Sequence, residues 1–347
     1  GQRNALPIVI EALKRLEYRG YDSSGCALIH QGELQVYKRE GKIIELERSL
    51  PEPNKCSGNI AIAHTRWATH GEPNEVNAHP HLDCKGEIAI VHNGIIENYK
   101  LLKEKLMELG HHFVSDTDTE IIAHLIEQFL LSEPTLEDAV RSAMKRVEGT
   151  YGLVVMSLKN PDKLIAVRKG SPLIIGIGEN EHFITSDVNA IIIHTKRVIY
   201  LQDDELCVVK ANGFEITTLD KRCVKPEISV VDWDISAIEK GEFKHFMLKE
   251  IFEQPVTIEN AFRGRIHQQL GTARLGGLGI PSFELRKIKQ IHLVACGTSF
   301  YAALIGKYII EDLARIPVFA EYASEYRYRN PIIPEDTLVF VISQSGE

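Results

Sequence analysis

Residues 64–71 read His64-Thr65-Arg66-Trp67-Ala68-Thr69-His70-Gly71. They follow a short apolar run, residues 59–63, that predicts a strand, and they have neither helical nor strand periodicity themselves. We therefore expect a loop that leaves the edge of a sheet. Its mixture of cationic, aromatic, hydroxyl and imidazole groups fits either an ordered polar loop packed by its own side chains or a small-molecule clamp. In a clamp, Arg66 would grip a carboxylate through its planar guanidinium group.

The composition of the 347-residue chain is that of a globular protein long enough for two domains. Its net charge of -8 argues against a nucleic-acid partner. No apolar run approaches the roughly 20 residues of a membrane span, and no signal peptide is present, so we expect no membrane partner. The six cysteines show no CxxC spacing, which is typical of a reducing, cytoplasmic compartment.

Both ends predict that the chain is a fragment. It begins with Gly1 rather than Met, and its last apolar strand runs directly into residues 343–347. A domain normally ends in an exposed, dispensable segment rather than at the end of a strand. We therefore expect truncation on both sides.

Helical and strand patterns alternate through the first part of the chain. Helices are expected at residues 7–16, 101–109, 121–131 and 136–147, and a hairpin with strands at 26–30 and 34–38. Short β-rich runs then recur at residues 153–158, 164–167, 173–177, 183–185, 198–201 and 206–209. Strands, then helices, then many strands predict large sheets covered by helices rather than a parallel doubly wound unit.

The pair Asn93-Gly94 follows an apolar strand at residues 86–92. Asn-Gly is a strong hairpin signal, but helical spacing begins soon afterwards and ends at Gly110. The alternative is a corner between strand and helix with Asn93 and Gly94 at its tip. Such a corner would present an amide NH2 group and a backbone N–H together, as an oxyanion hole does.

Asp118 lies in a polar run, residues 115–120, that precedes a helix. Thr117 and Glu120 have the spacing of a capping box, which would explain part of this polarity. Asp118 has no such task. Beside an arginine that binds a carboxylate, an aspartate is what the ammonium group of an amino-acid substrate requires.

Histidines are frequent in the same part of the sequence, at positions 64, 70, 79, 81 and 92. Clustered histidines can indicate a metal site. Metal ligands usually recur at fixed spacing, and no helix aligns these histidines. We expect no metal, and we expect the histidines to hydrogen-bond loop backbone.

The last part of the chain has a different pattern. A helix at residues 244–254 is expected to end before Pro255. Strands at residues 291–295, 316–320 and 337–342, with a helix at 300–314, predict a parallel βαβ unit.

Two hydroxyl-bearing turns follow strands of this unit: Thr298-Ser299 and Ser343-Gln344-Ser345. Open α/β sheets bind ligands at the carboxyl ends of their strands, and helix N-termini there favour phosphate. Because there is no glycine-rich nucleotide motif, a sugar phosphate is favoured over a nucleotide. Ser and Thr are also routine helix caps, which is the alternative for each turn taken alone.

Together these motifs resemble the class II glutamine amidotransferases that carry sugar isomerase (SIS) domains. The resemblance rests on residues 64–71, 77–81 and 92–98, and it extends to residues 16–23, 249–255, 295–299 and 343–347. It implies an α+β N-terminal-nucleophile (αββα) glutaminase domain at residues 1–215. A connecting segment with an interdomain helix would follow at 216–283, and an incomplete first α/β SIS domain, flavodoxin-like with a parallel sheet, at 284–347.

The resemblance also implies a reaction. Glutamine would be hydrolysed in the first domain, and its ammonia would pass to fructose 6-phosphate in the SIS part, giving glucosamine 6-phosphate and glutamate for hexosamine biosynthesis and UDP-GlcNAc. No cofactor is implied, because the ammonia comes from amide hydrolysis. A homodimer through SIS domains is implied for the full-length protein.

The resemblance assigns roles by motif. Arg66 would hold the α-carboxylate of glutamine and Asp118 its ammonium group, while Asn93 and Gly94 would stabilise the tetrahedral intermediate. The pocket would also be lined by Trp67, Thr69 and His70. The sugar-phosphate positions would be Thr298, Ser299, Ser343, Gln344 and Ser345.

The nucleophile of the family is a cysteine at the mature N-terminus, whose α-amino group, with a pKa of about 7.7–8.0, serves as the base. Position 1 here is Gly1, and Cys26 opens an apolar strand and is no substitute. We expect the nucleophile upstream of Gly1 and the isomerising residues beyond Glu347. The 347-residue chain alone is therefore expected to lack synthase activity.

Two other functions stay open. Another class II amidotransferase would share the glutaminase half but would carry a nucleotide or phosphoribosyl site instead of the SIS turns. A non-catalytic, sugar-phosphate-sensing protein built from SIS modules would not need Arg66, Asp118 and Asn93-Gly94. A glutamine-binding measurement separates the second of these from an amidotransferase.

Overall fold

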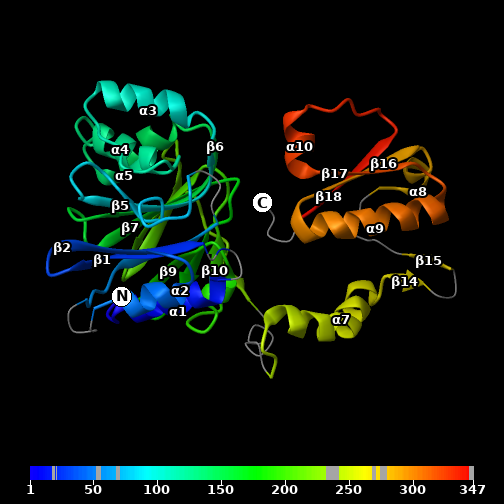
Figure 1. Cartoon of the computed structure of the whole chain (residues 1–347), viewed down its shortest axis with the longest axis horizontal. Coiled ribbons are helices and arrows are strands. Elements are labelled where there is room, and N and C mark those ends of the chain that lie inside the picture. Colours follow the sequence, from blue (N-terminus) through cyan, green and yellow to red (C-terminus); the bar gives the residue numbers. More distant parts are fainter. Residues whose placement is uncertain are drawn as a thin grey trace. The chain divides into compact units, whose positions relative to one another are not determined.

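The computed structural model describes residues 1–17, 20, 22–51, 56–67, 71–231, 242–267, 271–273 and 280–343. The chain divides into two compact units, Gly1–Ile238 and Glu239–Glu347 (Figure 1).

The first unit is built on a six-stranded antiparallel sheet with the strand order β12-β11-β7-β6-β5-β4. Its strands are β4 (His81–Leu82), β5 (Ile88–Ile96), β6 (Gly149–Ser157), β7 (Lys163–Lys169), β11 (Glu205–Lys210) and β12 (Gly213–Thr218). Successive strands pair as neighbours along most of the sheet, as antiparallel connections allow.

Two smaller antiparallel sheets form a second layer. One has the order β2-β1-β3, with β1 (Ser23–His30), β2 (Glu33–Glu40) and β3 (Ala61–Arg66). The other has the order β13-β10-β8-β9, with β8 (Ile174–Ile177), β9 (His182–Thr185), β10 (Arg197–Tyr200) and β13 (Ser229–Val230). The expected hairpin is confirmed as β1 and β2, joined through Gln31 and Gly32, both at positive φ.

Side-chain alternation along the strands explains why the two layers stack. In β5, Ile88 and Ile90 pack with helices α3 (Tyr99–Glu108), α4 (Glu120–Phe129) and α5 (Leu136–Met144). Ala89 and Val91 point the other way, into a core shared with the second layer. Because strand side chains alternate between faces, one strand serves two cores.

Helices α1 (Ala5–Leu16) and α2 (Ile43–Ser49) cover the outer face of the second layer. Leu6, Ile10 and Leu13 of α1 have helical spacing and pack on Cys26 and Leu28 of β1. In Figure 1, α1 and α2 lie on one side of the sheets and α3 to α5 on the other. The order helix, sheet, sheet, helix confirms the αββα prediction.

Three local predictions in this unit are wrong. Residues 64–66 are not a loop, because they continue β3 and pair with β1, with Arg66 opposite Ser23. Asn93 and Gly94 form neither a hairpin turn nor a corner, because they lie inside β5 opposite Gly152 and Tyr151 of β6. In both places the strand carries polar residues, which hide its alternation, and backbone pairing decides the structure.

The predicted capping box before α4 is also wrong. Thr119 is the N-cap residue, and its side chain makes no capping bond. The Glu120 carboxylate instead accepts hydrogen bonds from the backbone N–H groups of Val114, at 2.9 Å, and Ser115, at 2.7 Å. Glu120 therefore closes the loop of residues 114–119 onto the first turn of α4.

The second unit has a parallel sheet with the order β17-β16-β18, as predicted. Its strands are β16 (Gln290–Ala295), β17 (Val318–Tyr322) and β18 (Thr337–Ile342), and its core joins Ile291 and Leu293 to Ala303 of α9 (Gly297–Ala314). The unit also contains α7 (Phe246–Phe262), the two-stranded β14 (Ile266–His267) and β15 (Thr272–Ala273), α8 (Ser282–Leu285) and α10 (Ala323–Tyr328).

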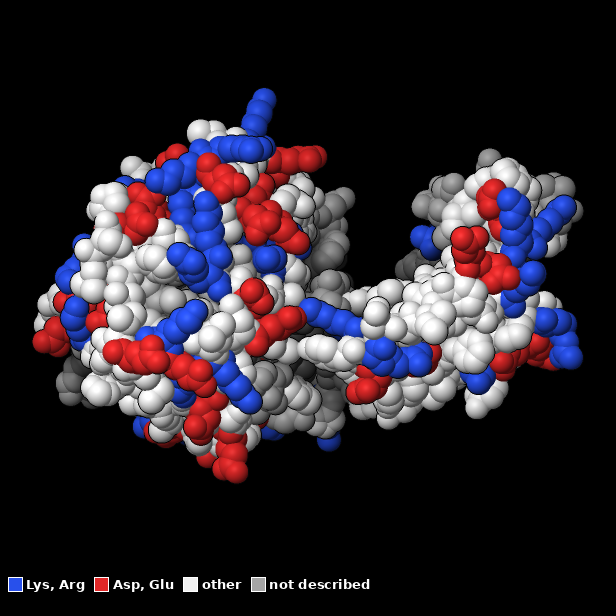
Figure 2. All heavy atoms as spheres, turned by 90° about the horizontal axis from the view of Figure 1, so that it is seen from above, with Lys and Arg blue, Asp and Glu red and all other residues white. Residues whose placement is uncertain are grey.

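Helix α7 does not end before Pro255, as predicted, but continues through it. Proline removes one backbone donor and strains the preceding turn, yet residues on both sides of Pro255 stay helical here. Among the described residues, no helix is long and apolar enough to cross a membrane. On the face drawn in Figure 2, basic and acidic side chains are intermingled over the surface.

Candidate functional site

Strands β3 and β5, which belong to different sheets, meet through a side-chain hydrogen bond. His64 of β3 and Asn93 of β5 are joined by Nε2 and Oδ1 at 2.7 Å. Because the amide oxygen can only accept, the proton lies on Nε2 of His64. Asn93 is thereby held by its oxygen, and its NH2 group is turned away from His64 with two hydrogens to donate.

Gly94 follows Asn93 in the strand with a φ of +133°. A Cβ atom at this position would collide with the carbonyl oxygen of Thr150. Only glycine therefore fits, both for its backbone conformation and for the close approach of β6. Asn-Gly pairs often form turns, but Gly94 lies inside the sheet. There its positive φ and its lack of a Cβ atom are what the structure requires.

Arg66 ends β3 and is buried, with 4% of its surface exposed. Its Nη2 donates to the carbonyl of Gly71 at 3.1 Å, and its Nη1 donates to that of Glu72 at 3.4 Å. Burial lowers the pKa of the guanidinium group, and the charges of Asp22 and Asp118 oppose that effect. Arg66 thus anchors the chain that follows β3 and also lies in the electrostatic field of Asp118.

Asp118 is equally buried, in the loop before α4. Its Oδ2 accepts a hydrogen bond of 2.7 Å from the backbone N–H of Ile96, the last residue of β5. The same loop thereby places Asp118 beside the strand that carries Asn93 and Gly94. The structure brings Arg66, Asn93, Gly94 and Asp118 to the ends of β3 and β5.

Three buried histidines near His64 and Asp118 form a network with two threonines of the loop before α4. We call His79, His81, His92, Thr117 and Thr119 the histidine–threonine network. His79 Nε2 and His92 Nδ1 both lie near Thr119 Oγ1, at 3.1 and 2.9 Å. His81 Nε2 lies 3.1 Å from Thr117 Oγ1. The expectation of loop backbone partners is not met by these contacts: His92 Nε2 donates to a backbone carbonyl at 3.3 Å, but that carbonyl belongs to Thr150 in β6.

Protons can be assigned along this network. His92 donates through Nε2, so its Nδ1 accepts from the Thr119 hydroxyl, and that oxygen in turn accepts from Nε2 of His79. Burial lowers the pKa of His64 to about 4 and that of His79 and His81 well below the usual value. Neutral rings can therefore pack together, and the rings of His64 and His79 lie 4.2 Å apart.

The other residues that the resemblance implicates lie in several different environments. Trp67 is mostly exposed, with 60% of its surface accessible. Thr298 and Ser299 lie in the first turn of α9, which begins earlier than predicted, at Gly297. Ser343 follows β18 directly, and β16 and β18 end together, since Ala295 pairs with Ile342. Thr69, His70, Gln344 and Ser345 lie outside the described residues.

Cys26 was excluded as a nucleophile from its sequence context. It is fully buried in β1, and burial raises the pKa of its thiol to about 12. A thiol in that environment stays protonated near neutral pH and is unreactive.

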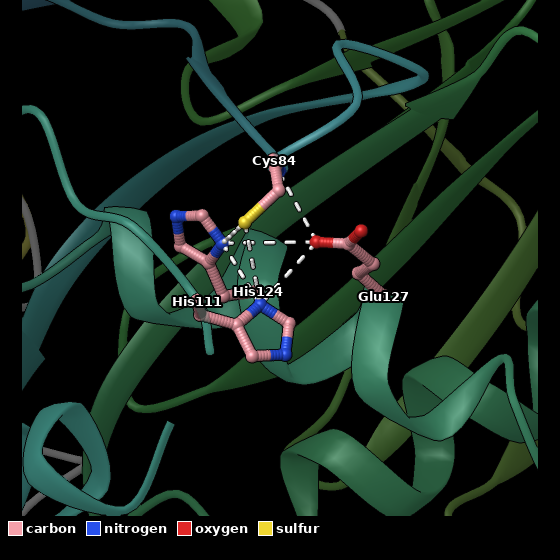
Figure 3. A group of neighbouring side chains, drawn as sticks. All are labelled: Cys84, His111, His124 and Glu127. Carbon is pink, nitrogen blue, oxygen red and sulfur yellow. Dashed lines mark hydrogen bonds and ion pairs between the residues drawn. The ribbon is translucent and has the colours of Figure 1, made fainter. Parts of the chain in front are cut away.

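Sequence reasoning missed a second group of polar residues, Cys84, His111, His124 and Glu127, which we call the Cys84 group. Its donor atoms all lie within 4.8 Å of one another (Figure 3). One sequence signal pointed to it: His124 and Glu127 are three residues apart and share a face of α4. Nothing local joins Cys84 and His111 to that helix.

Comparisons with known proteins identify the two parts of the chain. The family described as "Glutamine amidotransferase domain" matches residues 64–192, and the family described as "SIS domain" matches residues 284–347. The chain therefore contains a region that matches a glutamine amidotransferase domain, followed by one that matches a SIS domain, as the sequence resemblance indicated.

The particular relatives are proteins named glutamine–fructose-6-phosphate aminotransferase (isomerizing). The one from Chlorobaculum tepidum is 48% identical over 351 residues, which cover 100% of this chain and 57% of that protein. The one from Caldanaerobacter subterraneus subsp. tengcongensis is 48% identical over 347 residues, covering 100% of this chain and 56% of that protein. The chain thus spans just over half the length of the curated relatives it matches.

Solved structures agree on the fold. Glutamine phosphoribosylpyrophosphate amidotransferase from B. subtilis, complexed with ADP and GMP, has a TM-score of 0.56. The likeness covers 96% of this chain and 70% of that one, at 19% sequence identity. This confirms the N-terminal-nucleophile type of fold and carries no information about the substrate.

Proposed function

We propose that the protein containing this chain is a glutamine-dependent amidotransferase that forms glucosamine 6-phosphate and glutamate from fructose 6-phosphate and glutamine. The observation that carries the proposal is the 46–48% identity to eight aminotransferases of that name along the whole chain. A region that matches a glutamine amidotransferase domain and one that matches a SIS domain follow each other in this chain. The first would serve glutamine and the second the sugar phosphate.

The glutamine pocket is proposed at the ends of β3 and β5. Arg66 would bind the α-carboxylate, and Asp118 would bind the α-ammonium group, which explains why two opposite charges are buried near each other. Thr69, His70 and Trp67 would complete this end of the pocket.

The other end of glutamine would lie against Asn93 and Gly94. When a nucleophile adds to the side-chain amide of glutamine, negative charge develops on its oxygen. The Asn93 NH2 group, oriented by His64, is a donor for that charge, and losing one such donor costs about 10²–10³ in rate. The C–N bond would then break, the nitrogen would take a proton and leave as ammonia, and water would release glutamate from the acylated nucleophile.

The sugar phosphate is proposed to bind at the carboxyl end of the parallel sheet. Thr298 and Ser299 in the first turn of α9, and Ser343 after β18, lie at the ends of adjacent strands. Backbone N–H groups at the start of a helix suit a phosphate. Gln344 and Ser345 belong to the same proposed site.

Glutamine binding to the chain, measured by titration calorimetry, tests the first pocket. Arg66→Ala should weaken binding by roughly 10–100-fold, since a charge-assisted hydrogen bond contributes about 1.5–3 kcal/mol. Arg48→Ala, an exposed arginine of α2, should leave binding unchanged. Equal affinity for both variants would exclude Arg66 from the pocket.

The variant Asp118→Asn tests whether glutamine binding requires the negative charge of Asp118 or only its hydrogen bond to the backbone of Ile96. Asparagine keeps an oxygen for the Ile96 N–H but loses the negative charge that the ammonium group requires. Binding should weaken about 10-fold or more, while Asp116→Asn at the exposed neighbouring aspartate should have no effect. Formation of glucosamine 6-phosphate by the full-length protein tests the complete reaction, and transfer to another acceptor would refute the proposed substrate.

A further inference from the structure

The Cys84 group lies outside the proposed glutamine pocket and gathers four metal-binding side chains from three parts of the fold. Cys84 follows β4, His111 precedes the loop before α4, and His124 and Glu127 lie on α4. His124 is 1% exposed and His111 8%, whereas Cys84 reaches the surface. The group is therefore a mostly buried site with one side open to solvent.

The four donor atoms converge on one point (Figure 3). Nδ1 of His111 and Nδ1 of His124 are 3.3 Å apart, and Sγ of Cys84 lies 3.5 and 3.3 Å from them. Oε2 of Glu127 lies 3.3 Å from Nδ1 of His111 and 3.8 Å from Nδ1 of His124. A tetrahedral zinc ion with bonds of about 2.0–2.3 Å keeps its ligand atoms roughly 3.3–3.6 Å apart. The five distances above are 3.3–3.8 Å, and all four atoms lie within 4.8 Å of one another, so a small inward movement would complete the coordination.

The outer nitrogens of the two imidazoles determine what the inner nitrogens can do. Nε2 of His111 lies 3.1 Å from Oε1 of Gln128, and Nε2 of His124 lies 3.5 Å from Oε1 of Glu120. Both partners are acceptors, so both Nε2 atoms carry the proton. Each Nδ1 then presents a lone pair to the centre of the group.

Hydrogen bonds alone do not account for these contacts. Oε2 of Glu127 accepts a hydrogen bond of 3.1 Å from the backbone N–H of Cys84, but two Nδ1 lone pairs still face each other, and the thiol of Cys84 brings only one proton to share between them. A protonated imidazole would satisfy one further contact and leave the others facing acceptors. A divalent cation satisfies all four atoms at once, and a thiolate with a carboxylate supplies the two negative charges that it needs.

We propose that Cys84, His111, His124 and Glu127 bind a structural Zn²⁺ ion. Sulfur and imidazole nitrogen are preferred zinc ligands, and a site closed by four protein ligands is structural rather than catalytic. The Gln128 and Glu120 contacts are the outer-sphere hydrogen bonds that orient metal-binding histidines. Glu120 also fixes the backbone of Val114 and Ser115, so the metal would hold the loop that carries Asp118.

The first experiment measures metal in the purified chain. Elemental analysis after gel filtration should find about one Zn²⁺ per chain. Replacing zinc by Co²⁺ should give the visible bands of tetrahedral cobalt and a thiolate-to-cobalt charge-transfer band. Both signals come from the unmodified chain, so the proposal stays testable even if a variant fails to fold.

Variants then assign the ligands. Cys84→Ser should lose the metal and the charge-transfer band, and His124→Gln should lose the metal. The matched controls are Cys223→Ser and His112→Gln, which alter an exposed cysteine and the exposed neighbour of His111, and both should retain it. Gln128→Ala should keep all four ligands but weaken zinc binding by roughly 10–100-fold.

Two results would contradict the zinc proposal. A folded chain that carries no zinc, and whose cobalt titration shows no charge-transfer band, would make the Cys84 group a hydrogen-bonded cluster without a metal. Zinc retained equally by Cys84→Ser and by the parent chain would place the metal elsewhere. Neither measurement involves glutamine, so its failure is separable from failure of the proposed function.

Discussion

The loop of residues 114–119 contributes two threonines to the histidine–threonine network, and His111 and His124 of the Cys84 group lie on either side of it in sequence. The two clusters nevertheless differ in how the nitrogen atoms of their imidazole rings find partners. In the network, each short contact pairs an imidazole nitrogen with a hydroxyl or carbonyl, so one group can donate and the other accept. In the Cys84 group, two imidazole nitrogens face each other and a carboxylate. Rings held by hydroxyls need only protons, whereas rings whose lone pairs converge need a cation.

The largest expected effect comes from removing the cation. If zinc stabilises the folded chain at a free concentration about 1,000 times its Kd, chelation should lower the free energy of unfolding by about 4 kcal/mol. Urea unfolding with buffered zinc and with a chelator measures this difference. Only the Cys84 group should respond, so Cys84→Ser should abolish the difference and Cys223→Ser should preserve it. Identical urea unfolding curves with and without chelator would show that the Cys84 group needs a cation no more than the histidine–threonine network does.

Lowering the pH should destabilise the folded chain through His64 and the histidines of the histidine–threonine network. His64, bonded to Asn93 beside the network, has a pKa of about 4 in the folded chain because it is buried, against about 6.5 when unfolded. Between these values the unfolded chain binds the extra proton, so stability falls as pH falls from 6.5 to 4 and is unaffected above 6.5. The loss from His64 is at most about 3 kcal/mol, and His79 and His81 add in the same direction.

Urea unfolding at several pH values, with chelator present to exclude zinc, measures this slope. His64→Gln keeps a donor for Asn93 but cannot titrate, so its slope should be shallower than that of the parent chain. His112→Gln, an exposed histidine, serves as the control and should leave the slope unchanged. A slope unaltered by His64→Gln would mean that His64 is already charged in the folded chain.

The proposed glutamine pocket and the Cys84 group differ in how far the sequence could predict them. The continuous apolar runs at residues 88–91 and 153–156 were sufficient to predict strands, and both faces of these strands are buried in the structure. Arg66 and Asp118 were found as charges in polar runs that local structure did not explain, and Asn93 as the amide that directly follows an apolar run. The strand positions of Arg66 and Asn93 were missed, because polar residues in β3 and β5 interrupt the apolar pattern that identifies a strand.

The Cys84 group was missed for a different reason. His124 and Glu127 lie in a helix whose described residues are mostly buried, and there they were indistinguishable from a helix face packed on the core. Cys84 stands 40 residues before His124, and only the packing of α4 on β4 and β5 brings them together. Long-range convergence of this kind follows from tertiary structure and has no local pattern.

The smallest expected effect lies at Thr119, whose hydroxyl links two rings of the network. Thr119→Val should leave Nε2 of His79 and Nδ1 of His92 without their partner and cost about 2 kcal/mol of unfolding free energy. Thr119→Ser keeps the hydroxyl and should cost no more than the missing methyl group, about 0.8 kcal/mol. Thr119 makes no capping bond to α4, so neither variant removes a helix cap. Both should retain zinc, because the Cys84 group does not use this hydroxyl, and equal losses for the two variants would show that the methyl group rather than the hydrogen bonds holds the network together.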